Sequence, residues 1–121
     1  MIFEKTKFGS ITIDGVKYTH DLYLNLDGTI TKRKKELSKP YSKGHTVLGP
    51  DEIKYLLDQK PETIIIGTGQ FGILPMPKES KELLDNSGVI LIKTKTPNAL
   101  PMLNALLKQK AKLVAILHLT C

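Results

Sequence analysis

The chain of 121 residues has little of several residue types: one cysteine, no tryptophan, three Phe and four Tyr. The single cysteine, Cys121 at the last position, excludes an internal disulfide framework and is typical of a reducing compartment. The aromatic residues are too sparse to form the stacking platform that single-stranded nucleic acid requires. We therefore expect no nucleic-acid ligand.

Long apolar runs are missing as well. No run approaches the roughly 20 residues that a membrane-spanning helix needs, and the N-terminal stretch MIFEKTK lacks the apolar core of a signal peptide. We therefore expect a soluble, cytoplasmic protein that does not enter a membrane. The composition is ordinary for a globular protein, 40% hydrophobic and 25% charged, and with this length it predicts a single α/β domain over residues 1–121.

Positive charge is distributed unevenly along the chain, whose formal net charge is +6. Residues 28–49 carry six Lys or Arg against one acid, and residues 86–121 carry five Lys and no acid. If these segments met in space, they could attract phosphate, an acidic protein or nucleic acid. The simpler interpretation is that the run KRKK, residues 32–35, alternates between the faces of an exposed edge strand and guards that edge.

The N-terminal part predicts antiparallel β structure. Apolar and polar residues alternate between residues 8 and 36, and Asp14-Gly15 and Asp27-Gly28 are typical of tight hairpin turns because these residue types tolerate positive φ. Residues 37–49 contain turn-forming residues without a clear period. We expect them to form a long surface connection.

From residue 50 the sequence predicts alternating helices and strands. The first expected helix starts at Pro50 and ends by Pro61, and the second covers Lys78–Asn86 and stops at Gly88. The third covers residues 98–109, with Thr96 or Asn98 as its cap. The expected strands are 62–66, a buried strand at 89–93, and 112–119. The third helix should be well buried because its apolar residues cover more than one face. Pro101 fits that helix only in its first turn, where its missing N–H leaves no gap.

This element order predicts the fold class. We expect a compact α/β domain with a mixed sheet, in which N-terminal β-hairpins are followed by a β-α-β-α-β part with helices flanking the sheet. The hairpins either join the mixed sheet or form a second small sheet.

The most conspicuous motif is GTGQFG, residues 67–72, which follows a β-branched run and has the G-x-G-x-x-G spacing of a dinucleotide-binding turn. Such a turn must lead directly into a helix whose amides hold a pyrophosphate. Pro75 and Pro77 prevent a continuous helix from leaving Gly72, and the following strand ends at Lys93, where an acid would bind the ribose. We therefore predict no dinucleotide cofactor.

Two interpretations of this glycine loop remain open. The amides of Gly67, Thr68, Gly69 and Gln70, with Phe71 completing the candidate ligand loop, could form a small anion-binding nest at the end of a strand. Alternatively, the glycines make only a structural turn. If the loop binds an anion, Gly69→Val should abolish binding and leave the fold largely intact.

Four further residues are candidate polar groups for a pocket: His45, Lys93, His118 and Cys121. Three of them could ligate a metal, but the spacing supplies no fourth ligand, so we predict no metal site. A thiolate and base pair of Cys121 with His118 is disfavoured because residues three apart on a strand point to opposite faces. His20 and Asp21 are interpreted as neighbours on opposite strand faces. We predict no catalytic residue.

Four stretches resemble a known family: SKGHTV, IIIGTGQFGILPMP, TPNALPMLNALLKQ and AILHLTC. The chain is similar in them to a small single-domain family of uncharacterised proteins that includes the adipogenesis-associated protein of vertebrates and, more distantly, a mitochondrial complex I assembly factor. The resemblance covers almost the whole chain and implies a compact α/β domain with a mixed sheet. It implies no enzymatic activity, metal or cofactor, and it suggests factors that work through protein contacts. The shared positions, without an assigned role, are Gly67, Thr68, Gly69, His118, Thr120 and Cys121.

Two functional hypotheses from different classes follow. The first is a non-catalytic protein-interaction or assembly and regulatory factor with protein partners, compatible with a homo-oligomer. The second is a small-molecule binding protein or enzyme with a pocket for an anionic metabolite at the Gly67–Phe71 loop, using His45 or His118 and Lys93 as polar groups. We favour the first because of the resemblance and because the sequence contains no convergent catalytic set.

Overall fold

The computed structural model describes residues 1–42 and 46–121. It forms the predicted compact α/β domain with a mixed sheet. A small antiparallel sheet contains β1 (Phe3–Lys7), β2 (Ser10–Ile13) and β3 (Val16–Tyr18). A larger sheet, in the order β5-β4-β8-β6-β7, contains β4 (Leu22–Leu24), β5 (Ile30–Lys32), β6 (Thr63–Thr68), β7 (Ile90–Thr94) and β8 (Leu113–His118). The helices are α1 (Pro50–Leu57), α2 (Lys78–Ser87) and α3 (Thr96–Lys108), with short 3-10 turns η1 (Lys35–Leu37) and η2 (Lys39–Tyr41).

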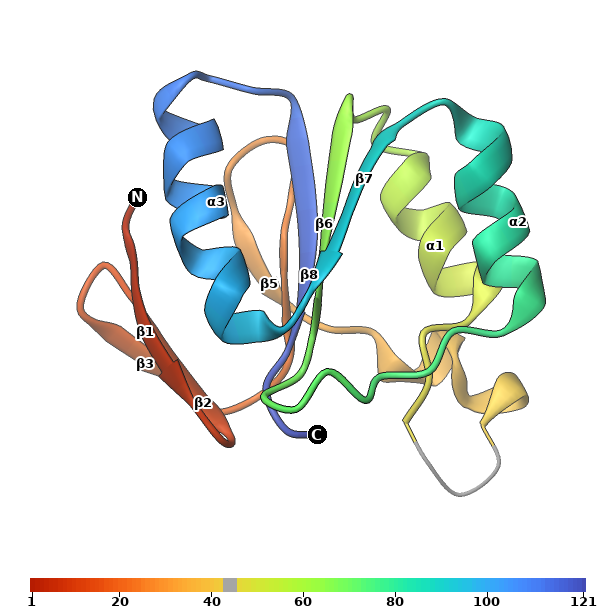
Figure 1. The fold of residues 1–121 in the computed structure, drawn as a ribbon, viewed down its shortest axis with the longest axis horizontal. Coiled ribbons are helices and arrows are strands. Elements are labelled where there is room, and N and C mark those ends of the chain that lie inside the picture. Colours follow the sequence, from red (N-terminus) through yellow and green to blue (C-terminus); the bar gives the residue numbers. More distant parts are fainter. Residues whose placement is uncertain (43–45) are drawn as a thin grey trace.

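The elements are stacked in four layers (Figure 1). Helix α3 lies between the small sheet and one face of the large sheet, and α1 and α2 cover the other face. The two central strands supply both cores because successive side chains on a strand point to opposite faces. Ile65 of β6 and Leu117 of β8 pack in the core on the α3 side, whereas Ile64 and Ile116 pack in the core beneath α1 and α2.

Strand direction determines which chain segments meet at one edge of the large sheet. Strands β8, β6 and β7 are parallel, and β4 runs antiparallel to β8 and to β5. The carboxyl ends of β5, β6, β7 and β8 therefore share an edge with the amino end of β4. Open α/β sheets usually place ligands at such carboxyl edges.

The two predicted hairpins are confirmed. Asp14 and Gly15, with φ of 51° and 78°, connect β2 to β3, and Gly28, with φ of 88°, lies between β4 and β5. The first hairpin joins the small sheet and the second joins the mixed sheet, so both expected placements occur. Strand β1 precedes the predicted β region and was not anticipated, because only Phe3 among its residues is buried.

Two predictions about burial were wrong. The strand predicted as buried, β7, is an edge strand paired only with β6, and Ile90 and Leu91 are 63% and 38% exposed. A short apolar run fits an edge strand as well as a central one, so periodicity could not decide this point. The connection after residue 36 does not stay on the surface, since Ser38 and Leu48 are buried.

The start of α3 also differs from the prediction. The helix begins at Thr96, and neither Thr96 nor Asn98 caps it. Pro101 lies inside the helix beyond its first turn, on the exposed side. Burial is one-sided, because Ala99 and Leu103 are buried whereas Met102 is 40% exposed. Among residues 1–42 and 46–121, no helix has the length and apolar character that crossing a membrane requires.

The position of Pro101 generates a stability prediction. An interior proline removes one hydrogen bond of the helix and crowds the carbonyl one turn earlier, at a cost of about 3 kcal/mol. Pro101→Ala should therefore raise the free energy of unfolding by roughly 1 to 3 kcal/mol. The expected value lies below the full cost of the proline because alanine gives the unfolded chain more conformational freedom. Urea unfolding of the two proteins measures this difference. A less stable variant would show that the proline ring itself contributes packing.

Candidate functional site

A cluster of buried ionisable side chains lies at the carboxyl edge of the large sheet. Asp21 immediately precedes β4, Arg33 immediately follows β5, His118 ends β8, and Glu52 lies in the first turn of α1. Each of these four residues is at most 4% exposed. Buried charges require partners, and we refer to these four residues as the charged cluster.

Arg33 bridges the two carboxylates of this cluster. Its Nε and Nη2 donate to the two oxygens of Glu52 at 2.7 and 2.9 Å, and its Nη1 donates to Asp21 Oδ2 at 3.0 Å. Nη2 also donates to the carbonyl of Val47 at 2.6 Å. The planar guanidinium suits this task because its donors have a fixed fork geometry. One side chain thus joins the end of β5, the start of β4, helix α1 and the segment before it.

Asp21 connects this bridge to the C-terminal strand. The Nδ1 of His118 lies 2.6 Å from Asp21 Oδ2, and the N–H of Leu119 donates to Asp21 Oδ1 at 2.8 Å. Burial by itself would raise the pKa of Asp21, but the hydrogen bond and charge of His118, the Leu119 amide and Arg33 together lower it from 3.8 to about 2. The carboxylate is therefore ionised in the folded protein at neutral pH.

Glu52 connects the bridge to the interior of the domain. It accepts hydrogen bonds from the hydroxyls of Tyr23, at 2.6 Å, and Ser38, at 2.5 Å. Burial and the Glu52 carboxylate raise the pKa of Tyr23 above its ordinary value, which keeps this hydroxyl a donor. Within the described part of the chain, every buried side-chain nitrogen and oxygen has a hydrogen-bond partner. The polar groups of the cluster are thus satisfied by one another and by neighbouring groups of the chain, which favours an architectural role.

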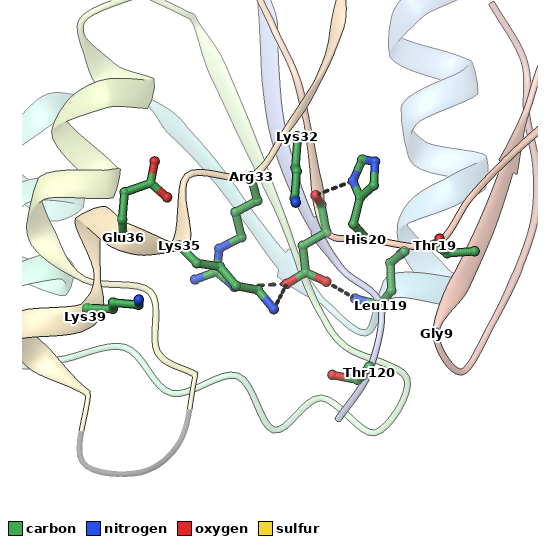
Figure 2. Close-up of a pocket in the computed structure, with 11 residues that line it drawn as sticks. Gly9, Thr19, His20, Lys32, Arg33, Lys35, Glu36, Lys39, Leu119 and Thr120 are labelled. Carbon is green, nitrogen blue, oxygen red and sulfur yellow. Dashed lines mark hydrogen bonds and ion pairs between the residues drawn. The ribbon is translucent and has the colours of Figure 1, made fainter.

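Asp21 and Arg33 help to line a hollow of about 490 Å³ (Figure 2). Its polar rim carries the side chains of His20, Lys32, Lys35, Glu36, Lys39 and Thr120, and Asp21 and Arg33 contribute to its floor. We call this space the basic hollow, because its rim holds three lysines and one acid. It joins part of the predicted positive segment, residues 28–49, to the C-terminal residues.

The structure uses the predicted ligand loop to hold the C-terminus. Gly67 and Thr68 belong to β6. The amide of Gly69 donates to Thr96 Oγ1 at 2.9 Å, and those of Gln70 and Phe71 donate to the carbonyls of Thr120 and Cys121 at 2.7 and 3.3 Å. These donors are engaged within the chain, so they do not offer the predicted anion nest.

Gly69 itself is required by the backbone. Its φ is 105°, and a Cβ built at this position would lie 2.3 Å from the carbonyl carbon of Cys121. A side chain therefore strains the turn and displaces the C-terminal segment. The expectation that Gly69→Val leaves the fold largely intact was wrong, and this substitution is no test of ligand binding.

The other candidate residues are not all brought together. His118 and Cys121 line a second hollow of about 400 Å³ with Ile73, whereas Lys93 is exposed on the edge strand β7 and lines neither hollow. His45 lies outside the described residues. Among the residues that are described, no three His, Cys, Asp or Glu side chains are grouped so that they could hold a metal ion.

Sequence reasoning singled out His118 but missed the other three residues of the charged cluster. It placed Arg33 among edge-guarding lysines and interpreted Asp21 as an ordinary strand neighbour, yet both are only 4% exposed. One signal was available: Arg33 is the only arginine among the 18 Lys and Arg residues of the chain. Arginine is preferred over lysine for buried ion pairs, because its charge is delocalised and weakly hydrated.

The bridge makes a prediction about folding stability. Arg33→Met should lower the free energy of unfolding by about 3 to 5 kcal/mol at neutral pH, because two buried carboxylates lose their shared cation. The matched control is Lys34→Met, which removes the same charge from the exposed neighbouring residue and should cost less than about 1 kcal/mol. Urea unfolding measures both. Equal losses in the two variants would contradict the bridging role.

Asp21 should make stability depend on acid. Its folded pKa is depressed from 3.8 to about 2, so its contribution of roughly 2 kcal/mol is present above pH 4 and is lost as the pH falls toward 2. Asp21→Asn lacks this titration. The stability difference between the wild type and Asp21→Asn should therefore shrink below pH 4, as measured by urea unfolding at pH 6 and between pH 4 and pH 2. A difference independent of pH would contradict the assignment.

Comparison with known proteins places this architecture in a family. Residues 3–118 match a family described as "Protein of unknown function (DUF498/DUF598)". The crystal structure of the conserved hypothetical protein PH1505 from Pyrococcus horikoshii OT3 has 34% sequence identity and a TM-score of 0.85, with all of both chains covered. The protein MT938 has 32% identity and a TM-score of 0.80, with 99% of this chain and 98% of that chain covered.

A more distant structure shares the fold alone. The solution structure of a Mth938-like domain from Bordetella pertussis has 18% identity and a TM-score of 0.62, with 98% of this chain and 85% of that chain covered. The family match spans nearly the whole chain, from β1 to the end of β8. The protein is thus a member of the DUF498/DUF598 family, whose function is unknown.

Proposed function

We propose that this chain is a non-catalytic protein-interaction domain that serves as an assembly or regulatory factor. The observation that carries the proposal is a group of exposed apolar side chains beside the C-terminus. Phe8, Phe71 and Ile73 are 57%, 61% and 60% exposed, and the two aromatic rings lie 6.1 Å apart. We call these three residues the aromatic patch. Aromatic side chains of this kind are common anchors of protein interfaces.

The backbone around the patch is held by the end of the chain. The amides of Phe71 and Ile73 both donate to the carbonyl of Cys121, and the amide of Gly9, next to Phe8, donates to the carbonyl of Leu119. The patch is therefore presented by segments that are tied to strand β8. Such preorganisation lowers the entropic cost of binding, so the patch suits an apolar side chain of a partner protein.

The family resemblance supports the same class of function. The likeness to the adipogenesis-associated protein and to a complex I assembly factor suggests work through protein contacts, and we include it in this proposal. The cytoplasm is the proposed location, on the basis of the single cysteine. The occupant that we propose for the patch is a different protein, and self-association is the competing outcome.

Substitution of Phe71 tests the proposal. Phe71→Thr should weaken partner binding at least tenfold, because a buried aromatic anchor at an interface contributes about 2 kcal/mol. The matched control is Ile90→Thr: Ile90 is 63% exposed, close to the value for Phe71, but lies at the opposite end of the large sheet. Capture from the native cell extract, followed by titration of the captured partner, measures the effect.

Several results would contradict the proposal. The first is that no captured partner distinguishes the two variants. The others are that Phe71→Thr binds the partner as tightly as the wild type, or that Phe71→Thr and Ile90→Thr lose the same affinity.

Sedimentation of the wild type tests whether the patch binds a second copy of this chain instead. Dimerisation that depends on concentration and is lost in Phe71→Thr would show that the partner is this chain itself. The free energy of unfolding of Phe71→Thr should lie within about 0.5 kcal/mol of the wild-type value, because the Phe71 side chain is exposed.

A further inference from the structure

We propose that the basic hollow binds a small phosphate monoester. The inference is independent of the aromatic patch, because it uses other side chains and another surface. It rests on the arrangement of three lysines, on the hydrogen-bonded floor beneath them, and on the volume and chemistry of the lining.

The lysines come from three consecutive elements that converge on the hollow. Lys32 ends β5, Lys35 begins η1 and Lys39 begins η2. Among the described residues, Lys32 and Lys39 form no ion pair, and the contact of Lys35 with Asp21 is long, at 3.9 Å. Like charges held together repel one another, so an anion bound among them gains their combined attraction.

Figure 2 shows how the rim is arranged around the open space. Lys39 and Thr120 extend toward it from opposite sides, whereas the carboxylate of Glu36 points away from both. The lysine ammonium groups and the Thr120 hydroxyl can all donate hydrogen bonds to an oxyanion. Thr19 and His20 complete the polar side of the lining.

The acid on the floor, Asp21, already has partners within the chain. Asp21 is already paired with Arg33 at 3.0 Å and His118 at 2.6 Å, and it accepts the amide of Leu119. The side chain of Lys35 is 52% exposed, so it can leave its long contact with Asp21 and turn toward a ligand. The charged cluster thus fixes the floor and leaves the three lysines for the ligand.

The lining favours a phosphate over a carboxylate. Arginine clamps a planar carboxylate with two parallel bonds, but four of the five N–H groups of Arg33 already donate to Glu52, Asp21 and Val47. The remaining charged donors are lysine ammonium groups, which act as compact point charges and suit the three terminal oxygens of a phosphate. A hollow of about 490 Å³ has the size of a small-molecule site. The described residues of its lining include no Phe, Tyr or Trp to stack on a nucleobase, so a small ester is preferred over a nucleotide.

The test is an NMR titration of the ¹⁵N-labelled full chain with glycerol 3-phosphate at constant ionic strength. We expect saturable shifts of the amides of Thr19, His20 and Thr120. The double variant Lys32→Gln/Lys39→Gln should bind at least tenfold more weakly. The control, Lys81→Gln/Lys108→Gln, removes the same charge from exposed positions on α2 and α3 and should bind within twofold of wild type.

Parallel titrations with inorganic phosphate and succinate define the ligand class. Binding of inorganic phosphate without binding of succinate supports the proposal. Tighter binding of glycerol 3-phosphate than of inorganic phosphate shows that the hollow also contacts the glycerol part of the ester. The proposal is overturned if the hollow amides show no saturable shift, if both double variants lose binding equally, or if succinate binds as tightly as the ester. Phe71→Thr should leave this titration unchanged, so failure here and failure of the interaction proposal are distinguishable.

Discussion

The bridge that Arg33 makes between Asp21 and Glu52 is the interaction on which the edge of the large sheet depends. Its anchoring points lie in two separate parts of the sequence: Asp21 at the entry to β4, and Val47 with Glu52 at the start of helix α1. A buried ion pair of this kind contributes little net stability compared with apolar packing, but its loss is costly because an unpaired charge stays behind. The bridge therefore determines how these segments meet more than how strongly the domain folds.

The same bridge positions both proposed binding surfaces. Asp21 ties the entry to β4 to the amide of Leu119, and the following residues, Thr120 and Cys121, accept hydrogen bonds from the glycine loop. The basic hollow lies on one side of this C-terminal segment, and the aromatic patch adjoins it. The C-terminal segment thus contacts both the polar basic hollow and the apolar aromatic patch. This arrangement explains why a loop with the spacing of a nucleotide motif is used for architecture.

Particular elements show where sequence reasoning succeeds. Helix α2 was predicted well because Gly88 adopts the left-handed conformation at its end, with φ of 77°. The hairpin turns were predicted because Asp-Gly pairs accept positive φ. Strands β6 and β8 were predicted from uninterrupted apolar runs, which are typical of strands buried on both faces. In each case the signal is local, because it depends on residues that are neighbours in the chain.

The sequence by itself determined the α/β class, the order of most elements and the lack of a helix directly after Gly72, since proline and glycine restrict the backbone wherever they stand. Only the tertiary structure decided that β7 lies at an edge, that Arg33 is buried while its lysine neighbours are exposed, and that the amides of the glycine loop are occupied. These outcomes depend on contacts between residues such as Asp21 and His118, which are 97 positions apart. Periodicity describes which face a residue occupies within its own element, and it carries no information about which other element covers that face.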